Sequence, residues 1–187
     1  MRQLLSLALA FCLSGLLHAQ AIPLDSAFAY QLSNIGIDFV HPIGSDFRPR
    51  PNEDLRLLEI DQTLYSRQEK LEVRLAVISA EELGDMATMP HIAASRIIMD
   101  LGSNDEMAPP ITVHSFGSEE MEYFNADWAR QFTFRPKQGQ APYQLVQLTA
   151  LFKEGCGMAY VLLLFNQPPE TLDARQQLLR FRHTRDL

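Results

Sequence analysis

Cys156 is the residue best placed to act as a nucleophile, because it lies between two glycines at the start of a strongly apolar stretch. A thiol becomes reactive when a positive environment and a nearby base stabilise its thiolate. Lys153 lies three residues earlier, but Glu154 offsets its charge. The alternative interpretation is a small buried side chain in a tight turn, which is common for a free cysteine. We predict that Cys156 is structural.

A second possible catalytic site centres on His114. With Ser115 and Asp127 it supplies the residue types of a serine-hydrolase triad. The sequence, however, has no Gly-x-Ser-x-Gly motif and no glycine-rich nucleotide-binding loop. We therefore expect a protein without catalytic activity. A small hydrolase-type enzyme with a site around Cys156 or His114 is the alternative.

The histidines show no metal-binding pattern. Beyond the N-terminal segment they are His41, His91, His114 and His183, and no two have the short spacing of structural zinc ligands. The acidic loop at residues 100–106 lacks the spacing of a calcium-binding EF-hand. We predict no metal site and no cofactor.

Asp127, Trp128 and Arg130 form the candidate binding group. An aromatic ring between an acidic and a basic side chain can line a ligand pocket. Trp128 also shares strand parity with Phe132 and Phe134, and a lone tryptophan in that position is more often a core residue. The two interpretations predict different exposure for the indole ring.

Charge is unevenly distributed along the chain. The formal net charge is −7, which argues against a nucleic-acid-binding protein. Residues 81–122 hold nine acidic side chains and one arginine, whereas four arginines lie between residues 175 and 185. The acidic part could form a docking surface for a basic partner. The alternative is a solvated surface that aids solubility.

The first 21 residues have the organisation of a secretory signal peptide. Arg2 precedes an uncharged stretch at residues 4–17, and an Ala-x-Ala sequence ends at Ala21. We predict cleavage after Ala21 or Ala19 and a periplasmic or secreted mature protein. The uncharged stretch is shorter than the ~20 residues that a membrane-spanning helix needs, and no later stretch approaches that length.

A lipid anchor is not expected. Lipid attachment requires a small residue before the cysteine, and Phe11 precedes Cys12. Cys12 would therefore be removed with the signal peptide, which leaves Cys156 without a disulfide partner. The mature domain must be stabilised by its core alone, and its length is sufficient for that.

Residues 22–187 fit a single domain. The 187-residue chain is 47% hydrophobic and 21% charged, which is typical of a folded protein and excludes a disordered tail. Residues 22–54 hold four prolines and few periodic features, so we predict an N-terminal arm with one short strand at 36–40. Alternating apolar residues on both sides of the polar stretch 66–70 predict a hairpin.

The middle of the chain predicts helices around a short strand. Apolar spacing over 92–101 predicts an amphipathic helix, with Pro90 in its first turn and Gly102 as its C-terminal cap. A short strand at 111–116 follows. A brief helix is then predicted through Phe124, with Ser118 as its N-terminal cap.

The last third predicts three strands and a helix. Two alternating strands lie at 128–134 and 146–152, and the almost wholly apolar residues 158–165 predict a central strand covered on both faces. A final helix is predicted from 170 to 182. The complete order predicts an α+β fold, with one antiparallel sheet and helices on both faces, as in a three-layer α/β/α sandwich. The apolar residues expected to place the final helix on the sheet are Leu172, Leu178, Leu179 and Phe181.

Three segments carry a resemblance to a known fold group: FNADWARQFTFRPK (124–137), LTALFKEGCGMAYVLLLF (148–165) and LLRFR (178–182). Together with the order of elements, they resemble the PsbP-like and Mog-like group of α/β/α sandwiches. Members of this group include photosystem accessory subunits, a small-GTPase-binding protein and bacterial envelope proteins, and they share no catalytic residue. The resemblance implies an exported, non-catalytic binding or accessory module of the bacterial envelope, with a protein or small ligand as its partner.

Overall fold

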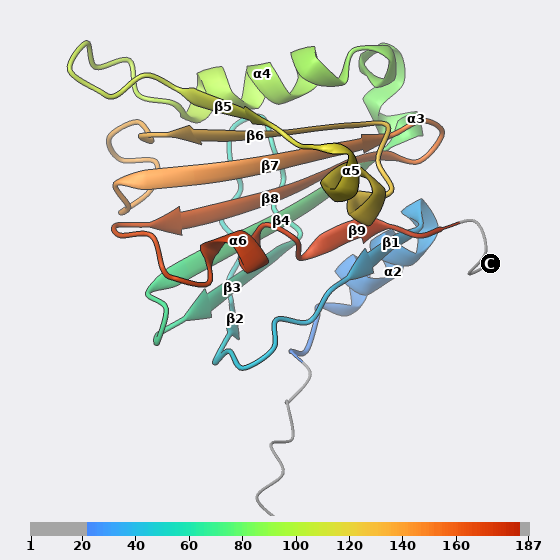
Figure 1. The fold of residues 1–187 in the computed structure, drawn as a ribbon, viewed down its shortest axis with the longest axis horizontal. Helices are drawn as coiled ribbons and strands as arrows, with labels where there is room; N and C mark the ends of the chain where they lie inside the picture. Colours follow the sequence, from blue (N-terminus) through green and yellow to red (C-terminus); the bar gives the residue numbers. More distant parts are fainter. Residues whose placement is uncertain (1–21, 184–187) are drawn as a thin grey trace, which may run out of the picture.

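The computed structural model describes residues 22–183, and a seven-stranded antiparallel sheet forms the centre of the fold (Figure 1). The sheet order is β2-β3-β4-β8-β7-β6-β5, so most strands that lie side by side also follow one another along the chain. The strands are β2 (Arg48–Arg50), β3 (Gln62–Ser66), β4 (Leu71–Ser79), β5 (Thr112–Ser115), β6 (Trp128–Phe134), β7 (Leu145–Lys153) and β8 (Gly157–Phe165).

A second, two-stranded sheet joins the two ends of the described chain. Its strands β1 (Ile37–Phe39) and β9 (Leu179–Phe181) are antiparallel, with Ile37 opposite Phe181. Several short helices complete an α+β protein, so the predicted class and antiparallel sheet are confirmed. The helices are α2 (Ser26–Ile35), α3 (Ala80–Leu83), the 3₁₀ helix η1 (Gly84–Thr88), α4 (Pro90–Leu101), α5 (Ser118–Phe124) and α6 (Leu172–Arg175).

β8 is the central strand, as its apolar sequence predicts. It pairs along its whole length with β7 on one side, and from Gly157 to Leu164 with β4 on the other. Every residue of β8 is buried, which a strand achieves only when both faces of the sheet are covered. The hairpin predicted around residues 66–70 is also confirmed, since β3 and β4 pair from Ser66 and Leu71.

The β7–β8 turn depends on glycine. Gly155 and Gly157 both have positive φ angles, of 75° and 135°. A Cβ atom at Gly157 would lie 2.1 Å from the carbonyl oxygen of Ile78 on the neighbouring strand. Any other residue at position 157 would therefore push β4 and β8 apart at this end of the sheet.

α4 covers one face of the sheet. Its buried residues include Ala94, Ile97 and Leu101, which belong to the same apolar cluster as Leu148 and Tyr160 of the sheet. Pro90 begins this helix, as predicted. Gly102 ends it in an extended conformation rather than the left-handed one that a glycine cap usually adopts, and its N–H donates to the Ile98 carbonyl at 2.7 Å.

The opposite face carries the other apolar cluster. Phe28 and Leu32 of α2, Phe124 of α5 and Phe181 of β9 all pack into it. Figure 1 shows α4 and α2 on opposite sides of the sheet. α5 matches the predicted bounds but not the predicted cap, because Gly117 rather than Ser118 precedes it and the Gly117 N–H donates to the Glu120 carboxylate at 2.7 Å.

The predicted N-terminal arm is partly wrong. Its short strand is confirmed as β1, but residues 26–35 form the helix α2. Asp25 caps this helix by accepting a hydrogen bond from the Ala27 N–H at 2.8 Å, and Gly36 ends it in the left-handed region. The cap residues and the apolar spacing were both present in the sequence.

The predicted final helix is wrong. Only Leu172–Arg175 is helical, and residues 179–181 form β9 instead. Leu179 and Phe181 are buried while Arg180 between them is half-buried, which is the two-residue period of a strand. The prediction failed because β1 supplies a pairing partner from the other end of the chain. None of the helices within residues 22–183 is long and apolar enough to span a membrane.

Candidate functional site

The structure does not bring together the two residues of the alternative, hydrolase-type interpretation. Cys156 lies half-buried in the β7–β8 turn, and His114 is exposed on β5. His114 is opposite Gln131, which is opposite Thr149 on β7, four residues before the turn. The two residues are thus about 13 Å apart along the strands and about 10 Å apart across them, from ordinary strand spacings.

Cys156 makes contacts of a structural kind. Its N–H donates to the Lys153 carbonyl at 3.1 Å, and its carbonyl accepts from the Ala80 N–H at 3.0 Å. Its side chain packs against the apolar cluster that includes Leu151 and Ala159. These contacts close the β7–β8 turn and tie it to the start of α3.

The serine-hydrolase arrangement is also not assembled. Successive residues of a strand point to opposite faces, so Ser115 and His114 diverge. Asp127 lies four residues along β6 from the partner of His114, and its carboxylate accepts the Glu154 N–H at 2.8 Å. Asp127 therefore fastens the β7–β8 turn.

Two of the three candidate binding residues lie together. The Arg130 guanidinium carbon is 6.0 Å from the centre of the Trp128 ring, on the face of the sheet that α4 covers. Trp128 is half-buried and contacts that apolar cluster. The position of Trp128 therefore fits a core residue better than a residue that lines an open pocket. Asp127 is not part of this pair, because its carboxylate bonds to the Glu154 N–H.

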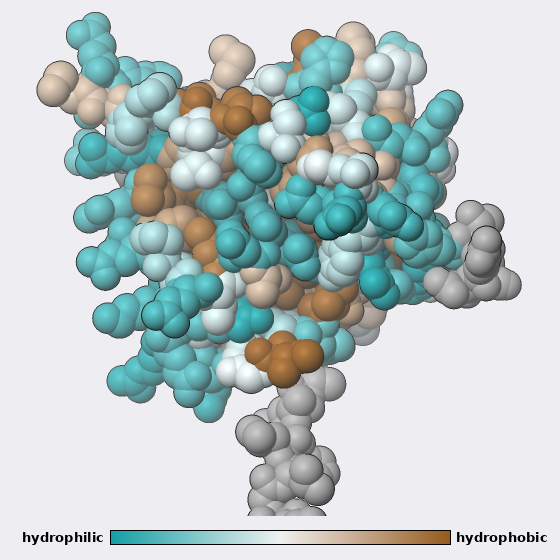
Figure 2. All heavy atoms as spheres, in the orientation of Figure 1, coloured by the Kyte–Doolittle hydropathy of each residue, from teal (hydrophilic) through white to brown (hydrophobic). Residues whose placement is uncertain are grey.

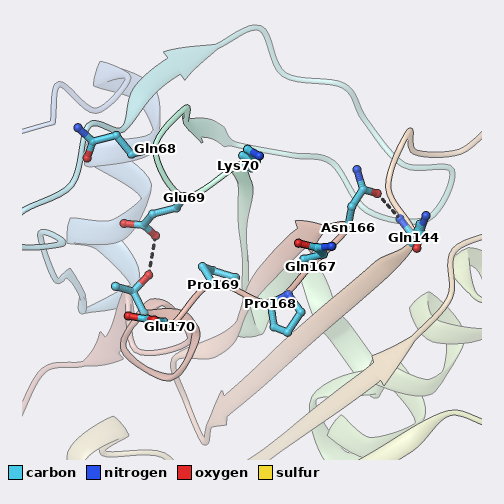
Figure 3. Close-up of a pocket in the computed structure, with 10 residues that line it drawn as sticks. Gln68, Glu69, Lys70, Gln144, Asn166, Gln167, Pro168, Pro169 and Glu170 are labelled. Atoms are coloured by element: carbon cyan, nitrogen blue, oxygen red, sulfur yellow. Dashed lines mark hydrogen bonds between the residues drawn. The ribbon is translucent and has the colours of Figure 1, made fainter.

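A cleft of about 660 Å³, which sequence reasoning did not identify, lies at one end of the sheet, and Figure 3 shows the residues that line it. The β3–β4 turn and the segment after β8 form its walls, and Asn166 accepts the Gln144 N–H at 3.0 Å across one end. Both carboxylate oxygens of Glu69 bond to Arg175, at 2.7 and 3.0 Å, and one also accepts the Thr171 hydroxyl. The Glu69 carboxylate is therefore occupied by internal partners, whereas Lys70 and Glu170 are the other charged residues of the wall.

The arginines near the C-terminus are paired. Arg175 is buried against Glu69, and Arg182 lies 2.8 Å from Asp38, which Arg180 also approaches at 3.8 Å. The predicted basic end of the chain is consequently not an open cationic surface over residues 175–182. Arg185 lies outside the described residues.

A buried charge network, which the sequence did not reveal, supports the β2 end of the sheet. Glu72 and Arg74 are adjacent on one face of β4 and form an ion pair at 2.8 Å. Arg50 of β2 reaches Glu72 at 3.4 Å and lies 3.7 Å above the ring of Tyr65. The Tyr143 hydroxyl donates to Glu72 at 3.0 Å, and burial followed by the charge of Glu72 raises the pKa of Tyr143.

The two edges of the sheet are built differently. β2 is Arg-Pro-Arg, and Pro49 has no N–H to offer another strand. β5 contains neither proline nor charge, and all four of its residues are exposed. β5 pairs with β6 alone, and no other backbone hydrogen bond reaches it from residues 22–183. Its outward N–H and C=O groups are accessible.

Apolar and acidic side chains surround this accessible edge. Val113 of β5 is 56% exposed, and Ile111 and Met107 just before it are 45% and 87% exposed. The loop that leads into β5 carries exposed Asp105 and Glu106. Figure 1 shows this loop projecting beyond the sheet at the upper left, and Figure 2 shows a largely hydrophilic face with scattered hydrophobic residues.

No family model, curated protein or solved structure matches the chain. Within residues 22–183, no group of three or more His, Cys, Asp or Glu side chains is close enough to hold a metal ion.

Proposed function

We propose that this chain is an exported, non-catalytic binding module of the bacterial envelope, which binds a partner protein at the β5 edge of its sheet. The observation that carries the proposal is the difference between the two edges. Proline and two arginines block β2, whereas β5 exposes backbone donors and acceptors next to Val113. An exposed sheet edge is a known template for an added strand.

The proposal includes the finer fold, a PsbP-like three-layer sandwich. It is supported by α4 on one face of the sheet and by α2 and α5 on the other. The resemblance then supports an accessory role, because members of that group include photosystem accessory subunits and a small-GTPase-binding protein.

The hydrolase alternative has less support. His114 lies on β5 and Cys156 lies in the β7–β8 turn, about 13 Å away along the sheet. His114 is instead part of the exposed edge itself. The position of His114 therefore fits a residue that contacts the bound partner.

The binding proposal is tested by photocrosslinking in the envelope. A photoreactive residue is placed at His114 in one variant and at Arg48, on the blocked edge, in the control. We expect a discrete adduct from position 114 and none from position 48. Equal adducts at both positions, or none at either, would contradict binding at this edge.

Edge-blocking prolines complete that experiment. Adjacent N–H groups of an antiparallel strand alternate between the partner strand and the solvent. Of the two variants Val113→Pro and His114→Pro, one therefore loses an N–H that bonds to β6 and the other loses only an N–H that points to solvent. The second of these is the edge-blocking variant, and its melting temperature should equal that of the wild type. A photoreactive residue is then placed at Thr112, with and without the edge-blocking proline. The adduct should be much weaker in the chain that carries the proline.

Export is tested separately by intact mass. The protein recovered from the envelope or medium should begin at Ile22 or Gln20. A full-length species held in the membrane would show that residues 1–21 are retained.

A further inference from the structure

We infer that the β5 edge takes an extended polypeptide segment in which lysine or arginine alternates with apolar residues. This inference rests on the proposed binding function and names its partner. The occupant is a segment of another protein that becomes an additional strand beside β5. Three features carry the inference: the charge around the edge, the different character of its two faces, and the poor fit of a second copy.

The charge around β5 is strongly acidic. No lysine or arginine occurs from residue 97 to residue 129, while five acidic side chains flank the strand in that interval. Four of them are exposed, and Glu120 is half-buried at the start of α5. The flanking acidic residues are Asp105, Glu106, Glu119, Glu120 and Glu122.

The nearest basic side chains do little to offset this charge. Arg130, opposite Ser115, turns toward the Trp128 ring and donates to the Ala129 carbonyl at 2.9 Å. Lys137 donates to the last carbonyls of α4, with its Nζ 2.9 Å from the Met99 oxygen. Arg180 lies 5.6 Å from the Tyr123 ring of α5 and also approaches Asp38 at 3.8 Å. Arg135 remains as an exposed base after β6. A cationic segment is therefore favoured at this edge.

The two faces of β5 specify the alternation. Val113 and Ile111 share parity and lie on the α4 side, where Ile111 approaches Gly102 at the end of that helix. Thr112 and His114 lie on the opposite side. An added strand places its own alternate side chains over these two rows. Apolar side chains of the added strand would contact Val113 and Ile111 on the α4 side. Basic side chains would lie beside Thr112 and His114 on the other side, near the surrounding carboxylates.

A second copy of this chain fits the edge poorly. Joining two β5 strands would bring two sets of acidic side chains together, and like charges at an interface are unfavourable. β5 is also only four residues long, so the pairing alone would bury far less than the roughly 1,000 Å² of a stable interface. A longer basic segment can reach the flanking carboxylates as well.

The experiment uses defined peptides and the mature protein. The probes are blocked decapeptides of alternating Lys and Val, alternating Glu and Val, and the Lys-Val peptide with two central prolines. Binding is followed by fluorescence anisotropy at low and high salt. We expect the Lys-Val peptide to bind about tenfold tighter than the Glu-Val peptide, with a loss at high salt. The proline-containing peptide should not bind.

Matched variants separate the edge from the general charge of the protein. Glu106→Gln with Glu119→Gln should weaken Lys-Val binding about threefold. Glu81→Gln with Glu170→Gln removes the same charge from exposed positions elsewhere and should leave binding unchanged. The edge-blocking proline variant should lose binding.

Each other outcome has one meaning. Equal binding of both alternating peptides, lost in the edge-blocking variant, would overturn the basic partner and leave the proposed function intact. Lys-Val binding that survives edge blocking would overturn the inference as general electrostatic attraction. A doubled mass in sedimentation that edge blocking abolishes would identify a second copy as the occupant. Absence of both peptide binding and crosslinking would overturn inference and function together.

Discussion

The two edge strands of the sheet, β2 and β5, differ in their backbone donors, their exposure and the charges around them. At β2, Pro49 removes a backbone donor, and Arg50 is fixed between the Tyr65 ring and the buried carboxylate of Glu72. At β5, every residue is exposed and the nearby charges are acidic and largely unpaired with bases. Proline and charge are the usual protection of an edge against unwanted pairing. This difference between the two edges is the observation on which the proposed binding edge rests.

The largest expected effect comes from removing the support of the blocked edge. Arg74 is 3% exposed and pairs with Glu72 and Glu53. Arg74→Met should lower the free energy of unfolding by about 3 kcal/mol, because it leaves a buried carboxylate without its closest partner. Urea denaturation measures this loss.

The matched control for that variant is Arg48→Met. Arg48 is exposed on β2, so its loss should change the free energy of unfolding by less than about 0.5 kcal/mol. The double variant Glu72→Gln with Arg74→Met should recover part of the loss, since it removes the uncompensated charge. Equal losses for Arg48→Met and Arg74→Met would refute this explanation of the β2 edge.

The next effect is on association rather than folding. Arg48→Thr with Pro49→Val gives β2 the character of β5, and the variant should self-associate at high concentration because its edge becomes a template. Sedimentation velocity would show a species heavier than the monomer. The control Thr112→Ala, which leaves both edges in their present state, should show none. A monomeric double variant would mean that proline and arginine do not protect β2.

Burial also predicts a pH response on the β2–β4 side of the sheet. Burial raises the pKa of Asp61, whose carboxylate accepts the Val77 N–H at 2.8 Å. Because the pKa is higher in the folded state than in the unfolded chain, the free energy of unfolding falls as the pH rises from the unfolded pKa to the folded pKa, and it stays lower above that range. Asp61→Asn should therefore be more stable than the wild type at pH 7. This advantage should shrink as the pH falls toward the unfolded pKa, near 3.8. An advantage that does not vary with pH would exclude this cause.

The smallest effect is expected at the accessible edge. His114→Ala should change the free energy of unfolding by no more than about 0.5 kcal/mol, because the side chain is exposed on a strand that pairs on one side. Thermal and urea unfolding measure it. A loss several times larger would show that β5 is held by contacts beyond its ladder with β6.

Local patterns predicted most of the sheet. Residues 158–165 are apolar without interruption, and β7 alternates regularly, so both strands are specified by their own side chains. α4 was predicted for the same reason. α2 is not predicted by such local patterns, because prolines on both sides of it indicate an irregular segment, although Phe28, Leu32 and Ile35 have helical spacing.

The parts that were not predicted depend on pairings between distant residues. Leu179 and Phe181 fit a strand or the end of a helix equally well until β1 is known to lie beside them. That β5 is an edge strand depends on the order of seven strands, which no single segment determines. His114 was selected as a possible catalytic residue, and its position in the accessible edge could not be derived from its neighbours in the sequence.

The pairing of β1 with β9 has a consequence for how the chain is made. Ile37 and Phe181 are partners, so β1 lacks its partner strand until a segment about 140 residues further along the chain has been made. Contacts between such distant residues slow folding. Until β9 is available, the apolar side chain of Ile37, which is buried in the folded protein, lacks this cover. Exposed apolar surface and unpaired strand edges of this kind make incompletely folded chains prone to aggregation.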